Sequence, residues 1–147
     1  MKMTTKRVIR FGLLLAWLGL TILLSEQTGA ESARLSSRIT KWLISNLSLN
    51  IEFERLNGFM RELAHFGIHF VLAILSYRAF LTVFREKASV FVSLLLCGAI
   101  AAFDEFTQVG IPGRAREIYD LLLNFLGVSS GVNLSYLISK PLIKKPR

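Results

Sequence analysis

The chain has 147 residues, of which 52% are hydrophobic, and 18 Lys and Arg against 10 Asp and Glu give it a formal net charge of +8. A soluble protein this apolar would have too little polar surface to cover its core, so the composition favours a protein of the lipid bilayer. The single Cys97 excludes an internal disulfide and a cysteine-based zinc site, and we expect it to be a small buried hydrophobe. No linker or low-complexity tract interrupts the chain, which predicts one domain, residues 1–147.

Four apolar runs predict membrane-spanning helices, since a helix needs about 20 residues to cross the hydrocarbon core. The first comprises residues 8–24, and its one charged residue, Arg10, can extend to the interface. The others comprise residues 63–84, 88–106 and 118–138. These runs are too long for membrane β-strands. The expected fold class is therefore an all-α integral membrane protein with a bundle of four transmembrane helices.

The N-terminus has a second interpretation, a cleaved signal peptide. A basic start, an apolar stretch and Thr28-Gly29-Ala30 have the order that such peptides show. We expect the first span to be retained, because residues 8–24 are longer than a usual signal core and Thr28 fits the small-residue cleavage site poorly.

The segment between the first two spans, residues 25–62, is too long for a bare connection. Within it, residues 31–45 (ESARLSSRITKWLIS) predict an amphipathic helix in the first outer loop. Its apolar face comprises Leu35, Ile39, Trp42 and Leu43, and the neighbouring polar face comprises Arg34, Arg38, Lys41 and Ser45. This helix is expected either to lie along the membrane interface or to pack over the mouth of the bundle. Residues 46–50 (NLSLN) and 55–58 (RLNG) are expected to form turns.

Lys and Arg are distributed unevenly about the predicted spans. The side with both termini and residues 85–87 holds eleven of them and one acid, Glu86. The opposite side holds seven Lys and Arg and nine acids. By the positive-inside rule, both termini are expected in the cytoplasm and residues 26–61 and 107–117 outside. Because the Lys and Arg residues are divided between the two sides of the membrane and form no single basic surface, we expect no nucleic-acid partner.

Ionisable and amide side chains interrupt the last three spans at the outer end of each. On the third span, Asp104 and Gln108 are four residues apart and share a face, which Glu105 borders. On the second, one arc comprises Glu62, His65, His69, Ala73 and Ser76. On the fourth, one stripe comprises Asp120, Asn124, Gly127 and Gly131.

Charged groups at membrane depth usually face the interior of a bundle and pair with each other. The expected acids are Asp104, Glu105 and Asp120, and their expected partners across the helices are Arg61, Arg114 and His65. Gly127 and Gly131 are expected to let two helix backbones approach closely. The chemistry alone is compatible with a structural network and with a functional pocket.

Several of these segments resemble the VanZ-like membrane protein family. They are MRELAHF (60–66), DEFTQ (104–108), PGR (112–114) and YDLLLNFLG (119–127), and SEQTGAES (25–32) is similar to the segment that follows the family's first span. The resemblance covers roughly residues 8–135. The chain departs from the family pattern at Ala115-Arg116, where a Ser-Gly pair is common, at Asn124, where a second aspartate is frequent, and at His69, near a tyrosine position.

The resemblance implies a multi-pass protein of the bacterial cytoplasmic membrane that is connected with glycopeptide resistance, particularly to teicoplanin. The positions that match the family motif are Arg61, His65, Asp104, Glu105, Gln108, Arg114 and Asp120. With Asn124 they form the candidate functional cluster. No catalytic residue, cofactor or metal is assigned to them.

Three classes of function remain open. The first is a non-enzymatic protein that binds a membrane lipid or lipid-linked wall precursor, whose phosphate Arg61, Arg114 or Arg116 could contact. The second is a small transporter or flippase of a lipid-linked envelope component, which would require a homo-oligomer because four spans are few. The third is an intramembrane acid/base hydrolase, which no nucleophile motif supports. A metal site of His65, His69 and Glu105 rests on spacing alone, and we do not expect it.

Overall fold

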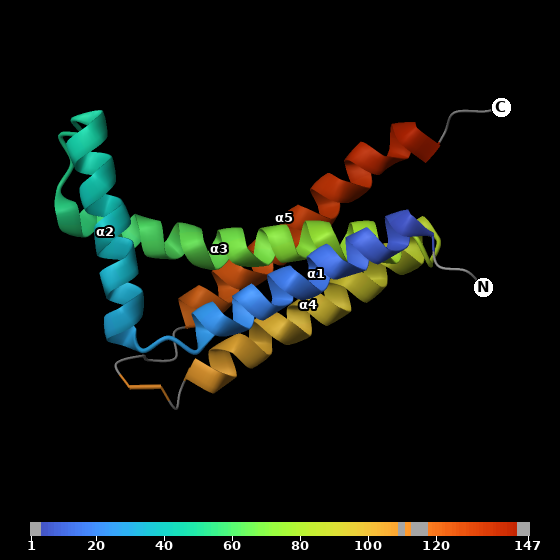
Figure 1. Cartoon of the computed structure of the whole chain (residues 1–147), viewed down its shortest axis with the longest axis horizontal. Coiled ribbons are helices and arrows are strands. Elements are labelled where there is room, and N and C mark those ends of the chain that lie inside the picture. The colour runs from blue at the N-terminus through green and yellow to red at the C-terminus, as the bar shows by residue number, and fades with distance from the viewer. Residues whose placement is uncertain (1–3, 109–110, 113–117, 144–147) are drawn as a thin grey trace.

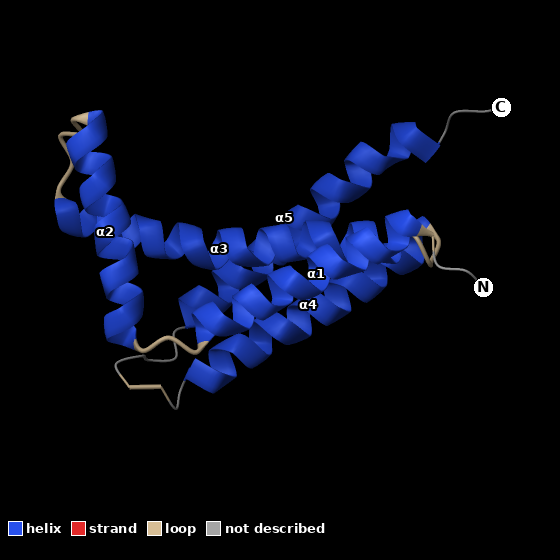
Figure 2. Cartoon of the chain, viewed as in Figure 1, coloured by secondary structure: helices blue, strands red, loops and turns tan. Residues whose placement is uncertain are grey.

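The computed structural model describes residues 4–108, 111–112 and 118–143, and these residues form helices and connections without a strand (Figures 1 and 2). The helices are α1 (Thr5–Ser25), α2 (Gly29–Leu47), α3 (Phe53–Phe80), α4 (Glu86–Gln108) and α5 (Ile118–Ile143). All except α2 contain a stretch long and apolar enough to cross a membrane. The predicted all-α fold with four spans and a helix in the first connection is confirmed.

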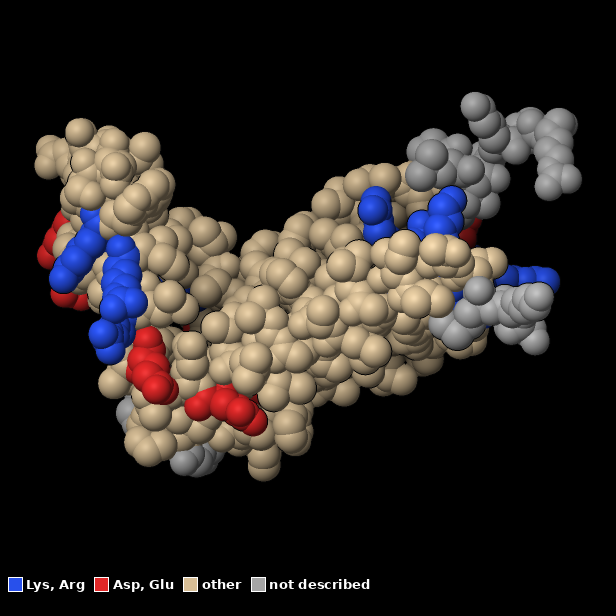
Figure 3. Space-filling view, viewed as in Figure 1, with Lys and Arg blue, Asp and Glu red and all other residues tan. Residues whose placement is uncertain are grey.

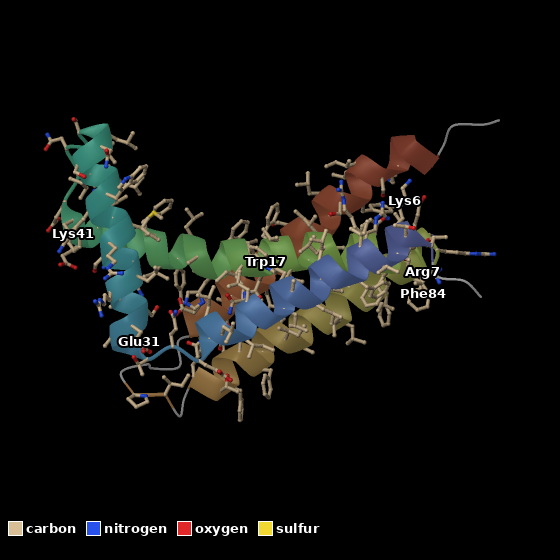
Figure 4. All side chains as sticks on the ribbon, in the orientation of Figure 1. Lys6, Arg7, Trp17, Glu31, Lys41 and Phe84 are labelled. Carbon is tan, nitrogen blue, oxygen red and sulfur yellow. The ribbon has the colours of Figure 1, made fainter. Side chains whose placement is uncertain are left out.

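Helix α3 is the central element of the bundle, because it contacts each of the other four helices. Its most extensive contact is with α5. In Figure 1, α2 runs across one end of the bundle, whereas both chain termini lie at the other end. Trp17 of α1 fixes one of these contacts by donating its indole N–H to the main-chain oxygen of Ile68 in α3 at 3.0 Å (Figure 4).

The surface of the bundle has an apolar middle between charged ends. Figure 3 shows the Lys, Arg, Asp and Glu side chains gathered at the two ends of the visible face. Lys6 and Arg7 lie at the end that holds the termini, and Glu31 and Lys41 lie at the end crossed by α2 (Figure 4). Large apolar side chains such as Leu15 and Phe91 are exposed between these ends, as expected of residues that face lipid. The arrangement is that of a multi-pass membrane protein.

The helix that contains the second predicted span begins at Phe53, ten residues before that span, and the expected turn at residues 55–58 is wrong. These residues belong to α3, and the Leu56 N–H donates to the oxygen of Glu52 as in a helix. The Asn57 side chain, which suggested a turn, instead accepts a hydrogen bond from Thr40 of α2 at 3.4 Å. At about 1.5 Å per residue, the 28 residues of α3 extend about 42 Å, so one end projects past a core of about 30 Å.

Helix α2 confirms the predicted helix over residues 31–45 and extends it at both ends. It begins with a capping box, in which the Thr28 hydroxyl accepts from the Glu31 N–H and the Glu31 carboxylate accepts from the Thr28 N–H at 2.8 Å. These donors favour the ionised form and lower the pKa of Glu31. The helix ends at Leu47, and its C-cap Ser48, with a left-handed φ of 48°, forms part of the turn expected at residues 46–50.

The contact between α3 and α5 depends on two glycines. A Cβ atom at Gly127 would overlap the main-chain oxygen of Phe66, and one at Gly131 would overlap that of Phe70. Such an approach of two backbones is possible only where the facing residue lacks a side chain. The predicted packing role of both glycines is confirmed.

Candidate functional site

The candidate site lies at the end of the bundle that α2 crosses, and α4 supplies two of its acids, Asp104 and Glu105. Asp104, Glu105 and Gln108 are all buried, as their predicted common face requires. They continue a buried stripe of small residues along α4, formed by Ser89, Ser93, Cys97 and Ala101. These small side chains allow α4 to pack closely at its middle, and the stripe then carries the larger polar groups into the bundle at its end. Cys97 is buried and unbridged, as predicted.

The two histidines of α3 face different acids. His65 lies between Glu105 of α4 and Asp120 of α5, with Nδ1 3.9 Å from Glu105 Oε1 and Nε2 3.5 Å from Asp120 Oδ2. His69 is fully buried one turn further on, and its Nε2 lies 4.0 Å from Asp104 Oδ2. Its Nδ1 lies 3.2 Å from the main-chain oxygen of His65.

Asn124 joins α5 to α4 at the centre of this cluster. Its side chain is completely buried, and its Nδ2 donates to Glu105 Oε1 at 3.2 Å. Its Oδ1 is buried and has no hydrogen-bond partner in the part of the chain that the structure describes. Buried amides are normally satisfied at both ends, so this oxygen is an exception that needs an explanation.

Of the two expected arginine partners, the structure describes only Arg61. Arg61 is exposed and makes no ion pair with a described acid, so its predicted pairing is not observed. Arg114, the other expected partner, and Arg116 lie outside the described residues. Within the described ranges, Asp104 and Asp120 have ion-pair distances only to histidines.

A cavity of about 240 Å³ lies next to the cluster, between α1, α2, α3 and α4. Its apolar lining includes Leu24, Leu35, Ile39, Leu63 and Ile68. Its polar lining includes Arg61, His65, His69, Asp104 and Gln108. The cavity therefore joins a hydrocarbon-like wall to the polar groups of the site.

The residues that α2 contributes to this cavity were not predicted from the sequence. They are Ser32, Leu35, Ser36 and Ile39, and their spacing of three and four residues is the signal that could have found them. The face of α2 that is buried in the protein carries Ser36 and Thr40. The predicted apolar face is largely open, with Trp42 61% exposed. Helix α2 therefore packs over the bundle, which is one of its two expected roles, and it also presents apolar side chains outward.

The cluster also differs from the metal arrangement considered from the sequence. The three side chains whose ligand atoms lie within 4.8 Å of one another are His65, Glu105 and Asp120. His69, which the spacing along α3 suggested as a co-ligand, is directed to Asp104 instead. The set of His65, His69 and Glu105 is therefore not brought together, because residues four apart on α3 face two different acids.

Four membrane-length helices around a buried polar cluster define a multi-pass helical membrane protein with a site inside one end of its bundle. The sequence model of the VanZ/LLP1 family matches residues 11–139, which is most of the chain. The protein belongs to this family, as the resemblance in its motifs indicated. It has no significant match among curated proteins or among solved structures.

Proposed function

We propose that the protein binds an amphiphile with a phosphate-bearing head group at the end of the bundle that α2 crosses. The amphiphile is a membrane lipid or a lipid-linked wall precursor, and no reaction is catalysed on it. Binding at the outer face lowers the susceptibility of the cell to lipid-tailed glycopeptides such as teicoplanin. The observation that carries this proposal is the cavity, whose lining is apolar on one side and polar on the other.

The dimensions and the lining of the cavity suit a head group with the first part of its tail. Small-molecule pockets commonly enclose about 300–1,000 Å³, so a space of about 240 Å³ is too small for a complete lipid. Arg61 lines the cavity and is also exposed, so its planar guanidinium can offer two parallel hydrogen bonds to a phosphate. Leu35 and Ile39 of α2 would contact the methylene groups that follow.

Helix α2 supports the placement of this cavity at a membrane surface. Arg34, Arg38 and Lys41 are exposed on it, beside the open side chains of Leu35 and Trp42. A helix that runs across the bundle with basic residues and tryptophan is typical of the interface between head groups and hydrocarbon (Figure 1). An amphiphile could therefore enter from the bilayer without leaving the interface.

Two serines of α2 provide a matched test. Ser32 lines the cavity and Ser37 does not, yet both are partly buried on the same helix. The variants are expressed in a bacterial strain that is susceptible to teicoplanin unless it carries this protein. Ser32→Phe is expected to abolish the tolerance, because the phenyl ring fills the cavity. Ser37→Phe is expected to preserve it, and immunoblots of membranes control for abundance.

Vancomycin, which lacks a lipid tail, serves as the second drug in this test. Its inhibitory concentration is expected to change less than that of teicoplanin when the wild-type protein is expressed. Equal protection by both serine variants at equal abundance would contradict the role of the cavity. Absence of any teicoplanin effect with the wild-type protein would contradict the resistance function itself.

A second candidate function, a flippase of a lipid-linked envelope component, is favoured by buried polar side chains deeper in the bundle. Ser76 and Ser93 are completely buried, and the hydroxyl oxygen of Ser93 lacks a partner among the described residues. Tyr77 and Ser139 form a hydrogen bond of 2.9 Å further along α3 and α5. In reconstituted vesicles, a flippase would move a fluorescent phospholipid between leaflets faster than empty vesicles do, whereas a binding protein would leave this rate unchanged.

A further inference from the structure

We propose that His65, Glu105 and Asp120 bind one divalent transition-metal ion, with Zn²⁺ as the preferred ion. This inference concerns the cluster alone and does not depend on an amphiphile in the neighbouring cavity. The three residues come from α3, α4 and α5, so an ion held by them would join three helices. None of the three side chains is fully exposed.

The separations between His65 and the two carboxylates are too long for hydrogen bonds. The distances of 3.9 and 3.5 Å from His65 to Glu105 and Asp120 both exceed the range of about 2.7–3.2 Å for a hydrogen bond to nitrogen. A protonated imidazole between two carboxylates would form bonds of about 2.7–2.9 Å. The two distances start from different ring nitrogens, so only one of them can separate two ligands of the same ion. Zinc bonds of about 2.0–2.2 Å at tetrahedral angles place neighbouring ligand atoms roughly 3.3–3.6 Å apart, and the 3.5 Å from His65 Nε2 to Asp120 Oδ2 lies in this range.

A small adjustment of side chains would complete the site. Because the three ligand atoms lie within 4.8 Å of one another, a point exists within about 2.8 Å of all three. Contraction to zinc bonding distance then requires each atom to move by less than about 1 Å. One ring nitrogen of His65 and one oxygen from each carboxylate would bind, and a fourth position would remain for water or for an oxygen of a phosphate.

The donor set selects the kind of ion. Mg²⁺ and Ca²⁺ are bound by oxygen ligands, whereas imidazole suits zinc and other transition metals. Two carboxylates and a dication are neutral together, which lowers the penalty for carboxylates at the end of a membrane bundle. Asp120 needs such a partner, because among the described residues its only ion-pair distance is to His65.

Asn124 supplies a second and independent indication. Its amide donates to Glu105 Oε1, in the manner of the outer partners that orient metal-binding carboxylates. Its own oxygen is buried next to the cluster without a partner in the described ranges, which a water on the metal would satisfy. A purely structural network would leave this oxygen unexplained.

The first experiment measures metal in the purified protein. The full chain, with an affinity tag free of histidine, is loaded with Zn²⁺ in detergent, desalted and analysed by mass spectrometry for metals. We expect close to one zinc per chain in the wild type and its loss in His65→Ala and Asp120→Asn. His69→Gln, one turn along the same helix, and Glu54→Gln, an exposed acid, are expected to retain it. Asn124→Ala is expected to weaken binding about 10- to 100-fold.

A second experiment gives a positive signal even where a variant loses stability. Asp120→Cys replaces one metal-binding group by another, so Co²⁺ bound at the site acquires a sulfur-to-metal charge-transfer band in the near ultraviolet. The band is expected in Asp120→Cys, absent from the wild type, and removed by excess Zn²⁺. Wild-type protein that is folded but binds no zinc, equal zinc in all variants, or no band in Asp120→Cys would each overturn the proposal.

Discussion

Replacing Gly127 by alanine is expected to destabilise the bundle, although alanine is the better helix former. The added Cβ would overlap the main-chain oxygen of Phe66 and lie 3.1 Å from the nitrogen of Phe70. Both are backbone atoms of α3, so no side-chain rotation can relieve the contact. Overpacking of this kind costs about 1–3 kcal/mol, and we expect the upper half of that range.

Gly67 is the matched control for this substitution. It lies in α3, and a Cβ there has no neighbour within 4 Å. Gly67→Ala should therefore leave stability unchanged or raise it by up to about 1 kcal/mol, the usual preference of a helix for alanine. The assay is thermal unfolding in detergent, followed by tryptophan fluorescence and by size-exclusion chromatography after heating. Equal stability of the two variants would refute the close contact between α3 and α5.

Three further predictions concern topology, the site and the cap of α2. Reporter fusions after residues 50 and 87 should be external and cytoplasmic, respectively, and the reverse result would contradict the orientation. The Asp104→Asn protein should insert into the membrane at near-normal abundance, measured by immunoblot, but should no longer protect the cell against teicoplanin in a susceptibility assay. Full protection would show that the Asp104 charge has only a structural role. Thr28→Ala should reduce stability by about 1 kcal/mol near neutral pH. Because the pKa of Glu31 is lowered, the bonds to its carboxylate contribute fully above the ordinary glutamate pKa and are lost as pH falls through the lowered value. The difference between wild type and Thr28→Ala should therefore shrink in acid melts without vanishing, because the Thr28 hydroxyl still accepts from the Glu31 N–H.

Much of the fold could be predicted because its main signals are local in the sequence. The lengths of the apolar runs determine the spans, and helical spacing alone places Asp104 and Gln108 on one face. The same spacing identifies Gly127 as a close-packing position. The beginning of α2 was also predictable, since Thr28 followed by Glu31 is a capping box, although the amphipathic pattern indicated a helix only from residue 31.

The remaining features depend on contacts between segments that are distant in sequence. The start of α3 was misjudged because Asn57 finds its partner, Thr40, on another helix, and a sequence window around Asn57 contains no sign of this. The side chains that face the acids could not be fixed from the sequence for a similar reason. Which of Arg61 and His65 reaches Glu105 depends on the rotation of α3 against α4, and helical spacing places both near the same end without fixing that rotation.

The close contact of α3 with α5 determines how near the groups of the polar cluster come to one another. Gly127 is less than one turn from Asn124, and Phe66, whose oxygen faces Gly127, is the neighbour of His65. The backbone contact therefore lies directly beside the groups that must reach one another across the two helices. A residue larger than glycine at position 127 would separate α3 from α5 where His65 lies 3.5 Å from Asp120. For this reason Gly127→Ala should lose zinc binding together with stability, whereas Gly67→Ala should preserve both.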